Sequence, residues 1–337
     1  MATPLEQTFF ALIKAGLHGE AARLSHEPTL QEWAGLLEMA RRQSVMGLLY
    51  RGVSFFPDGY PLPEPVLFRL VAEADRVERR GAALRSVAEG LMERLSSAGL
   101  HPILMKGPAV AAFYPEPLQR EYGDIDIYLP SEEFLSAPAA LEVPFTSAPD
   151  GSIHYQWEGV DVDQHRRYFD LHRPPQELPG PGTPEAVLLM LSAHALKHAC
   201  GTGVGLRQCI DMAVAYERLK VPQERLEEVY RRSGTRRWNR LLSAFIEQYL
   251  GFQPPFGGNG MPPDALLDIV LKGGNFGHHA AGRTAALEGS TFRRKADTAI
   301  RFLRKLPFSL RFAPRETISS LFSLARGQGQ HEEGTFD

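Results

Sequence analysis

Hydrophobic residues along the chain follow two spacings, which separate helical regions from a short strand-containing region. Over residues 30–49 and 65–98 they recur every three or four positions, which is typical of amphipathic helices. Residues 102–106 are a short apolar run, and residues 123–129 alternate carboxylate and aliphatic side chains. A period of two predicts a β-strand. The helical spacing returns after a proline- and glycine-rich linker at residues 173–184.

This order predicts an α+β protein with a small mixed sheet flanked by helical regions. We expect residues 84–98 to form a helix that packs on the sheet and ends at Gly99, because glycine commonly ends helices. A linker rich in Pro and Gly marks a domain boundary. The predicted regions are an N-terminal helical region (1–83), a core (84–175), a C-terminal helical domain (183–326) and a disordered tail (327–337).

Three sites carry the residue pattern of a helix start. Thr3 and Thr183 each precede a proline, and a threonine N-cap followed by proline is favoured at the first helical turn. Ser131 precedes two glutamates, whose negative charges are stabilising near a helix N-terminus. Helices are therefore predicted to begin after Thr3, Ser131 and Thr183.

The alternating segment contains Asp124 and Asp126. Residues two apart on a strand share a face, so the two carboxylates lie side by side and repel each other unless a cation lies between them. Carboxylate oxygens suit Mg²⁺ or Mn²⁺. These residues are therefore candidate metal ligands.

A second candidate feature is the turn at Gly107-Pro108, between the apolar run and the alternating strand. A glycine turn at a helix start can offer backbone N–H groups to phosphate. Pro108 lacks an N–H, and Lys106 or Arg120 are candidates to compensate for the missing donor. A phosphate cradle beside metal-binding carboxylates predicts phosphoryl or nucleotidyl transfer.

Residues 104–129, with KGP and GDIDIYL, resemble the DNA polymerase beta-like nucleotidyltransferase superfamily and, more narrowly, a bacterial branch of uncharacterised nucleotidyltransferases. The resemblance implies transfer of a nucleoside monophosphate from an NTP, with ATP as the expected donor, and release of pyrophosphate. Asp124 and Asp126 would bind Mg²⁺ or Mn²⁺. Lys106 and Gly107 would bind the triphosphate, with help from Arg120.

The superfamily usually places a third carboxylate on a neighbouring strand. Residues 168–173 are predicted as that strand, with Asp170 completing the metal site or acting as base and His172 orienting a carboxylate or contacting phosphate. Asp161 and Asp163 also alternate with valines, but we expect them in a hairpin turn. Asp170 is therefore the preferred candidate, and His154 is assigned to the sheet edge with a structural role as the alternative.

The helix predicted after Thr183 carries His194 and His198 on one face. With Cys200 nearby, zinc binding is one interpretation, but the pair lacks the glutamate of a His-Glu-x-x-His motif. The resemblance implies instead that His194, Lys197 and His198 line the nucleotide cleft. Simple packing of the histidines is the alternative.

Arg207 and Asp211 are four residues apart in the next predicted helix, where they can pair with each other. The functional alternative for Arg207 is contact with a triphosphate. The charge run around residues 76–80 is interpreted as a solvated helix face.

Bulk properties narrow the function classes. The net charge of −3 gives no general attraction to nucleic acid. Two cysteines form no disulfide framework; with no signal-peptide pattern and no apolar run long enough to span a membrane, we expect a cytoplasmic protein. The acceptor is open: a small molecule, peptide, protein or RNA. Two alternatives are a catalytically inactive nucleotide- or partner-binding protein and an RNA-modifying enzyme, the latter suggested by the basic residues of 291–326.

Overall fold

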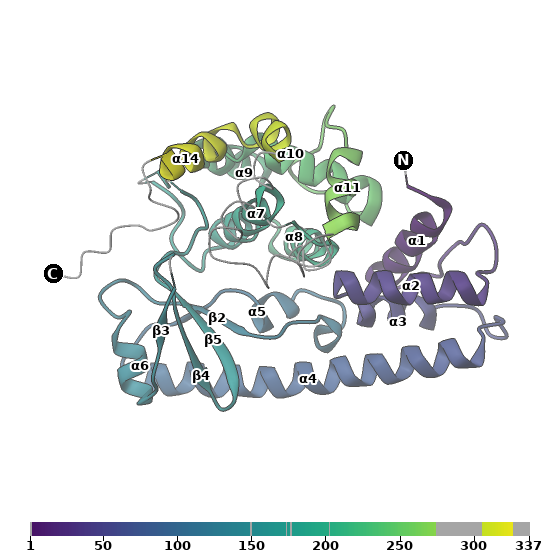
Figure 1. Cartoon of the computed structure of the whole chain (residues 1–337), viewed down its shortest axis with the longest axis horizontal. Helices are drawn as coiled ribbons and strands as arrows, with labels where there is room; N and C mark the ends of the chain where they lie inside the picture. The colour runs from purple at the N-terminus through teal and green to yellow at the C-terminus, as the bar shows by residue number, and fades with distance from the viewer. Residues whose placement is uncertain are drawn as a thin grey trace.

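The computed structural model describes residues 2–273 and 305–325, apart from residues 149, 173, 176 and 202. A small sheet and one long helix form one layer, and a group of helices from the second half of the chain forms another above it (Figure 1). The predicted α+β class with a mixed sheet and flanking helices is confirmed. No helix in the described ranges is long and apolar enough to cross a membrane.

The N-terminal helices are α1 (Pro4–His18), α2 (Leu30–Gln43) and α3 (Met46–Ser54). Thr3 caps α1 as predicted, and its hydroxyl accepts a hydrogen bond from the backbone N–H of Glu6. The single helix predicted over 30–49 is wrong, because Ser44 takes a left-handed conformation with φ 54° and separates α2 from α3.

Helix α4 (Glu64–Ser97) is continuous through residue 83, the predicted boundary between the N-terminal region and the core. Its C-terminal half packs on the sheet as predicted: Leu91 and Leu95 share an apolar cluster with Ile125 and Ile127, and all four are fully buried. Burying such a side chain contributes roughly 1.5–3 kcal/mol, so this contact anchors the sheet to α4.

The sheet has the strand order β1-β2-β5-β4-β3. The central pair, β2 and β5, is parallel, and the other neighbours are antiparallel. The strands are β1 (Ile103–Leu104), β2 (Ile125–Tyr128), β3 (Thr146–Ser147), β4 (Ile153–Trp157) and β5 (Val160–His165). Between β1 and β2 lie α5 (Pro108–Ala111) and a 3₁₀ turn (Pro117–Gln119), and α6 (Ser136–Leu141) precedes β3.

Two local predictions in this region are wrong. The described residues of the predicted strand, 168–172, form no strand, and the strand beside β2 is instead β5. Ser131 does not cap a helix: residues 131–135 are turns, and α6 begins at Ser136. Both predictions relied on short local patterns, whereas long-range pairing with β2 selected β5 as its neighbour.

The described residues from 184 onward are mostly helical, as predicted. Thr183 caps α7, and its hydroxyl accepts a hydrogen bond from the backbone N–H of Ala186. The N-terminal helices and these helices share one apolar core. The glycine-rich stretch 272–279, the basic region 291–326 and the tail 327–337 lie wholly or partly outside the described residues. The elements are α7 (Pro184–Cys200), α8 (Leu206–Leu219), α9 (Gln223–Ser233), α10 (Arg236–Phe245), a π-helical segment (Ile246–Leu250), α11 (Asp264–Gly273) and α14 (Pro314–Ala325).

Candidate active site

One face of the sheet carries the polar residues of the site. Asp126 on β2 lies opposite Asp163 on β5 in the parallel register, and Asp163 lies opposite His154 on β4. Because side chains alternate along a strand, Ile125 and Ile127 point to the other face, where they are buried. The alternation read from the sequence therefore does place carboxylates on one side and apolar side chains on the other.

Asp126 is held by two basic side chains. Its Oδ1 atom accepts a hydrogen bond from Lys106 Nζ at 2.7 Å and lies 2.9 Å from His165 Nε2. Burial alone would raise the pKa of Asp126, but the Lys106 ammonium and the hydrogen bond from His165 lower it well below the ordinary range. Asp126 is therefore ionised, and Lys106, which was predicted to bind the triphosphate, pairs with this carboxylate.

Asp124 behaves differently, although it belongs to the same motif. Its residue is exposed, at the mouth of the pocket described below. Partial desolvation and the negative charges of Asp126 and Asp163 raise the pKa of Asp124. Because Asp124 stays accessible to water, we attribute the shift mainly to repulsion between the carboxylates.

The predicted location of Asp163 in a hairpin turn is wrong. This residue lies within β5 and not in the hairpin turn, which is formed by Glu158 and Gly159 with φ of 48° and 77°. Its Oδ1 atom is hydrogen-bonded to Nδ1 of His154. The alternation of valine and aspartate at residues 160–163 was the available signal for a strand.

Asp170 reaches the same pocket from a segment without regular structure. Its oxygens lie 2.9 Å from His194 Nδ1 and 2.9 Å from Lys197 Nζ on α7. Burial opposes ionisation, but these two contacts hold the pKa of Asp170 well below its ordinary range. His198 packs against His194 edge to face, and burial together with the charge of its neighbours lowers its pKa to about 2. The predicted cluster on α7 is thus in the pocket, anchored to Asp170.

The guanidinium of Arg120 is buried and binds other groups of the protein. Its Nε and Nη2 atoms each donate to a different oxygen of Asp211 at 2.7 Å, and Nη1 donates to the carbonyl of Gly107 at 3.3 Å. Tyr114 also donates to Asp211 at 2.7 Å. The Arg120 and Asp211 side chains are only 4% and 7% exposed. This bidentate pair ties the loop before β2 to α8.

Arg207 and His172, two further predicted site residues, lie in different places. Arg207 lines the pocket and donates from Nη1 to the carbonyl of Glu121. His172 lies elsewhere: its Nδ1 atom is 3.1 Å from Glu316, and it also contacts Ser320 on α14. His172 therefore links the segment after β5 to α14 and does not contact the carboxylates of the sheet.

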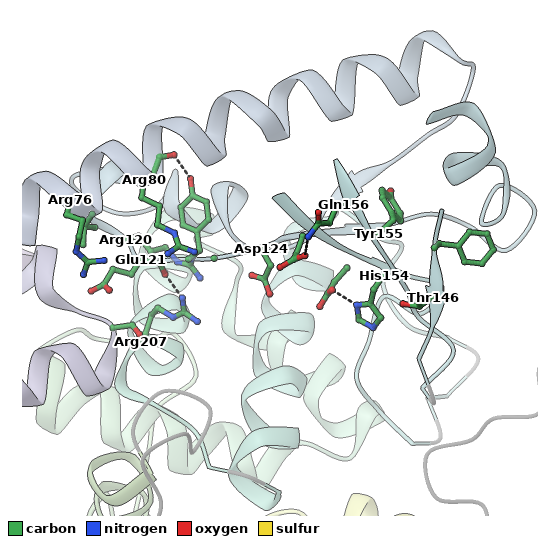
Figure 2. A pocket seen from close by; sticks show the side chains of 18 of the residues that line it. Arg76, Arg80, Arg120, Glu121, Asp124, Thr146, His154, Tyr155, Gln156 and Arg207 are labelled. Carbon is green, nitrogen blue, oxygen red and sulfur yellow. Dashed lines mark hydrogen bonds and ion pairs between the residues drawn. The ribbon is translucent and has the colours of Figure 1, made fainter. Parts of the chain in front are cut away.

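The polar face of the sheet borders two connected cavities. The inner pocket, of about 250 Å³, lies between the sheet and helices α7 and α8, and Lys106, Asp126, Asp170 and His194 line it. The outer groove, of about 1040 Å³, runs between α4 and strands β4 and β5. Asp124 and Asp163 line both cavities. Figure 2 shows Arg76, Arg80, Arg120 and Arg207 at one end of the groove, His154 and Gln156 at the other, and Asp124 between them.

Comparison with known protein families gives one match. Residues 29–251, more than half of the chain, match a family described as uncharacterised nucleotidyltransferases. The chain belongs to this family. No curated protein and no solved structure matches the chain. The family match includes α4 and both cavities, so it covers the whole site described above.

For a nucleotidyltransferase, the residues to test for metal binding are the three carboxylates of the sheet face, Asp124, Asp126 and Asp163. Within the described ranges no three acidic, histidine or cysteine side chains already converge on one point. The donor set nevertheless fits a hard divalent cation: three carboxylates on one sheet face, with hydrogen bonds recorded to only one oxygen of Asp126. Partial desolvation and the nearby charges of Asp126 and Asp163 raise the pKa of Asp124, and a bound cation would offset both effects.

Proposed function

We propose that the chain transfers a nucleoside monophosphate from an NTP, with ATP as the expected donor, to an acceptor hydroxyl or phosphate. The acceptor oxygen attacks the α-phosphorus, the bond to the β-phosphate oxygen breaks, pyrophosphate leaves and the acceptor loses a proton. The observation that carries the proposal is the parallel register of β2 and β5, which sets Asp163 beside Asp126 at a pocket that Asp124 also lines.

We assign Asp124, Asp126 and Asp163 as the residues that would hold Mg²⁺ or Mn²⁺, which would supply charge neutralisation at the phosphates when bound. Asp163, which also contacts His154, is the carboxylate that would accept the acceptor's proton. Lys106 and Gly107 form the pocket wall next to Asp126 and Asp124 and would face the donor phosphates.

The other predicted site residues take supporting roles in this proposal. Arg120 positions Gly107 through its hydrogen bond to the Gly107 carbonyl, while Nε and Nη2 bind Asp211. Asp170 positions His194 and Lys197. His194, Lys197, His198 and Arg207 line the pocket, where Lys197 and Arg207 supply positive charge toward the nucleotide.

The test is pyrophosphate release by purified protein. Each of the four NTPs is supplied with Mg²⁺ or Mn²⁺ and a cell extract as the source of acceptor, and wild-type protein is run beside Asp124→Asn. We expect release that requires Asp124, with the labelled product then naming the acceptor class. The matched control is Asp161→Asn, an exposed carboxylate on the same strand as Asp163.

One outcome would contradict the metal-site assignment, and another would contradict transfer. Release that is equal in wild type and in Asp124→Asn would remove the metal-site assignment. Nucleotide binding without release, at any NTP and with extract from several growth conditions, would favour the alternative of a binding protein on the same fold, which the missing N–H of Pro108 at the turn also motivates. The RNA-modifying alternative stays a prediction, because much of the basic region lies outside the described residues.

A further inference from the structure

Helix α4 supplies one wall of the outer groove, with Arg76 and Arg80 one helical turn apart. The charge run around residues 76–80 indicates a solvated helix face. In the structure the two arginines point from α4 toward the end of the groove at which Arg120 and Arg207 also lie (Figure 2). A helix of the N-terminal region therefore borders the candidate active site.

Arg80 differs from the other arginines of the groove in its contacts. Arg120 binds Asp211, Arg207 donates to the carbonyl of Glu121, and Arg76 pairs with Glu73 at 2.7 Å. For Arg80, the described part of the chain provides no hydrogen bond and no ion pair.

The guanidinium of Arg80 nevertheless has a definite neighbour. Its Nη2 atom lies beside Gly123, where a Cβ atom would come within 3.3 Å of it. Gly123 directly precedes Asp124. An uncompensated cation thus lies next to the backbone that carries the first candidate metal ligand.

The distribution of charge in the groove indicates the direction in which an anion would extend from the carboxylates. The wall formed by β4 and β5 carries Asp161 and Gln156, while the wall formed by α4 carries Arg76 and Arg80. We infer that the β- and γ-phosphates of the nucleotide donor extend toward α4 and that Arg80 contacts them. A guanidinium presents a planar set of donors that matches phosphate oxygens. The inference rests on the proposed function.

Binding of three ligands to wild-type protein, Arg80→Ala and Arg80→Lys tests the inference. The ligands are magnesium tripolyphosphate, the NTP that wild type binds best, and the matching nucleoside monophosphate. The control is Arg79→Ala, which removes the neighbouring arginine; Arg79 is exposed, pairs with Asp75 and does not line the groove. Arg80 is itself exposed, so its replacement should leave the protein folded, which a thermal unfolding scan checks.

If Arg80 contacts the β- and γ-phosphates, Arg80→Ala weakens binding of tripolyphosphate and of the NTP by about tenfold or more, with the monophosphate unchanged. Arg80→Lys loses less, because the charge stays and only the planar donor set is lost, and Arg79→Ala matches wild type. Equal NTP affinity in Arg80→Ala and wild type, or an equal loss for the monophosphate, would overturn the inference alone. Failure of wild type to bind any triphosphate would overturn the proposed function together with it.

Discussion

The inner pocket and the outer groove differ in how some of their charged side chains are paired. In the inner pocket, Asp126 contacts Lys106, and Asp170 contacts both His194 and Lys197, at distances from 2.7 to 2.9 Å. In the outer groove, Arg80 has no such partner in the described ranges and Asp124 is exposed beside two other carboxylates.

This difference in pairing distinguishes charged residues that bind other residues of the protein from charged residues that remain available to a ligand. Charges paired inside the protein have lowered carboxylate pKa values, as at Asp126 and Asp170, whereas the pKa of Asp124 is raised. A raised carboxylate pKa means that folding brings the ionised group into an unfavourable field. We expect that field to be relieved when a cation binds.

The largest expected effect is on stability, at the bidentate pair between Arg120 and Asp211. Arg120→Ala leaves Asp211 buried without its partner, which costs about 3–5 kcal/mol of unfolding free energy. Urea unfolding measures the loss. Arg79→Ala, which removes an exposed pair, should cost at most about 1 kcal/mol. Similar losses for the two variants would mean that Arg120 is not structural.

The second prediction concerns the identity of the third carboxylate. Asp163→Asn should reduce pyrophosphate release by about 100-fold or more, because the group would act both on the metal and on the acceptor's proton. Asp170→Asn should reduce it less when rates are corrected for the folded fraction, and Asp161→Asn should change it little. A larger loss for Asp170→Asn than for Asp163→Asn would restore Asp170 as the third carboxylate.

The third prediction concerns the turn between β1 and α5. Gly107 has φ 53° and ψ −117°, and a Cβ atom there would lie 3.3 Å from the carbonyl oxygen of Asp124. Gly107→Ala should therefore cost about 1–3 kcal/mol of stability and weaken NTP binding. Gly90→Ala on α4, where a Cβ meets nothing within 4 Å, is the control and should be neutral or stabilising. Wild-type stability in Gly107→Ala would contradict the assigned strain.

The smallest expected effect sharpens the contrast between Asp124 and Asp126. The raised pKa of Asp124 means that its ionised form destabilises the fold at pH 7 and that this cost vanishes below the ordinary aspartate range. Asp124→Asn should thus stabilise the ligand-free protein by about 0.5 kcal/mol at pH 7 and not at about pH 3. Thermal unfolding at the two pH values measures this.

Asp126→Asn should change the stability at pH 7 in the opposite direction. Its lowered pKa contributes stability above the ordinary aspartate range, and that stability is lost as the pH falls toward the lowered value. The variant should be less stable than wild type at pH 7, and the difference should shrink on acidification. The same sign for the two variants at pH 7 would show that the two carboxylates do not differ in this way.

Local signals account for the parts of the fold that were predicted. The helix starts at Thr3 and Thr183 depend on a hydroxyl and a neighbouring proline, and the strand with Asp126 depends on a strict alternation. The core position of Leu91 followed from helical spacing. Each of these requires only a few consecutive residues.

The parts that were missed depend on partners far away in the chain. Asp163 lies beside Asp126 through the pairing of β5 with β2, across more than 30 residues of sequence, which no local pattern specifies. Residues 168–172 show a similar alternation but form no strand, since β5 already occupies the position beside β2. Arg80 is exposed, as the charge run indicates, but the groove that it borders is completed by β4 and β5, which the helix pattern does not specify.

Because α4 is continuous, the protein cannot be truncated at residue 84 without cutting this helix. At about 1.5 Å per residue, its 34 residues make a rod of about 50 Å that joins the N-terminal helices to the sheet. A fragment cut at the predicted boundary, residue 84, would retain Asp124, Asp126 and Asp163 but lose Arg80 and the first half of that rod. The three candidate carboxylates therefore do not form a separable unit, and a fragment that keeps all of α4 with them would have to begin upstream of residue 64.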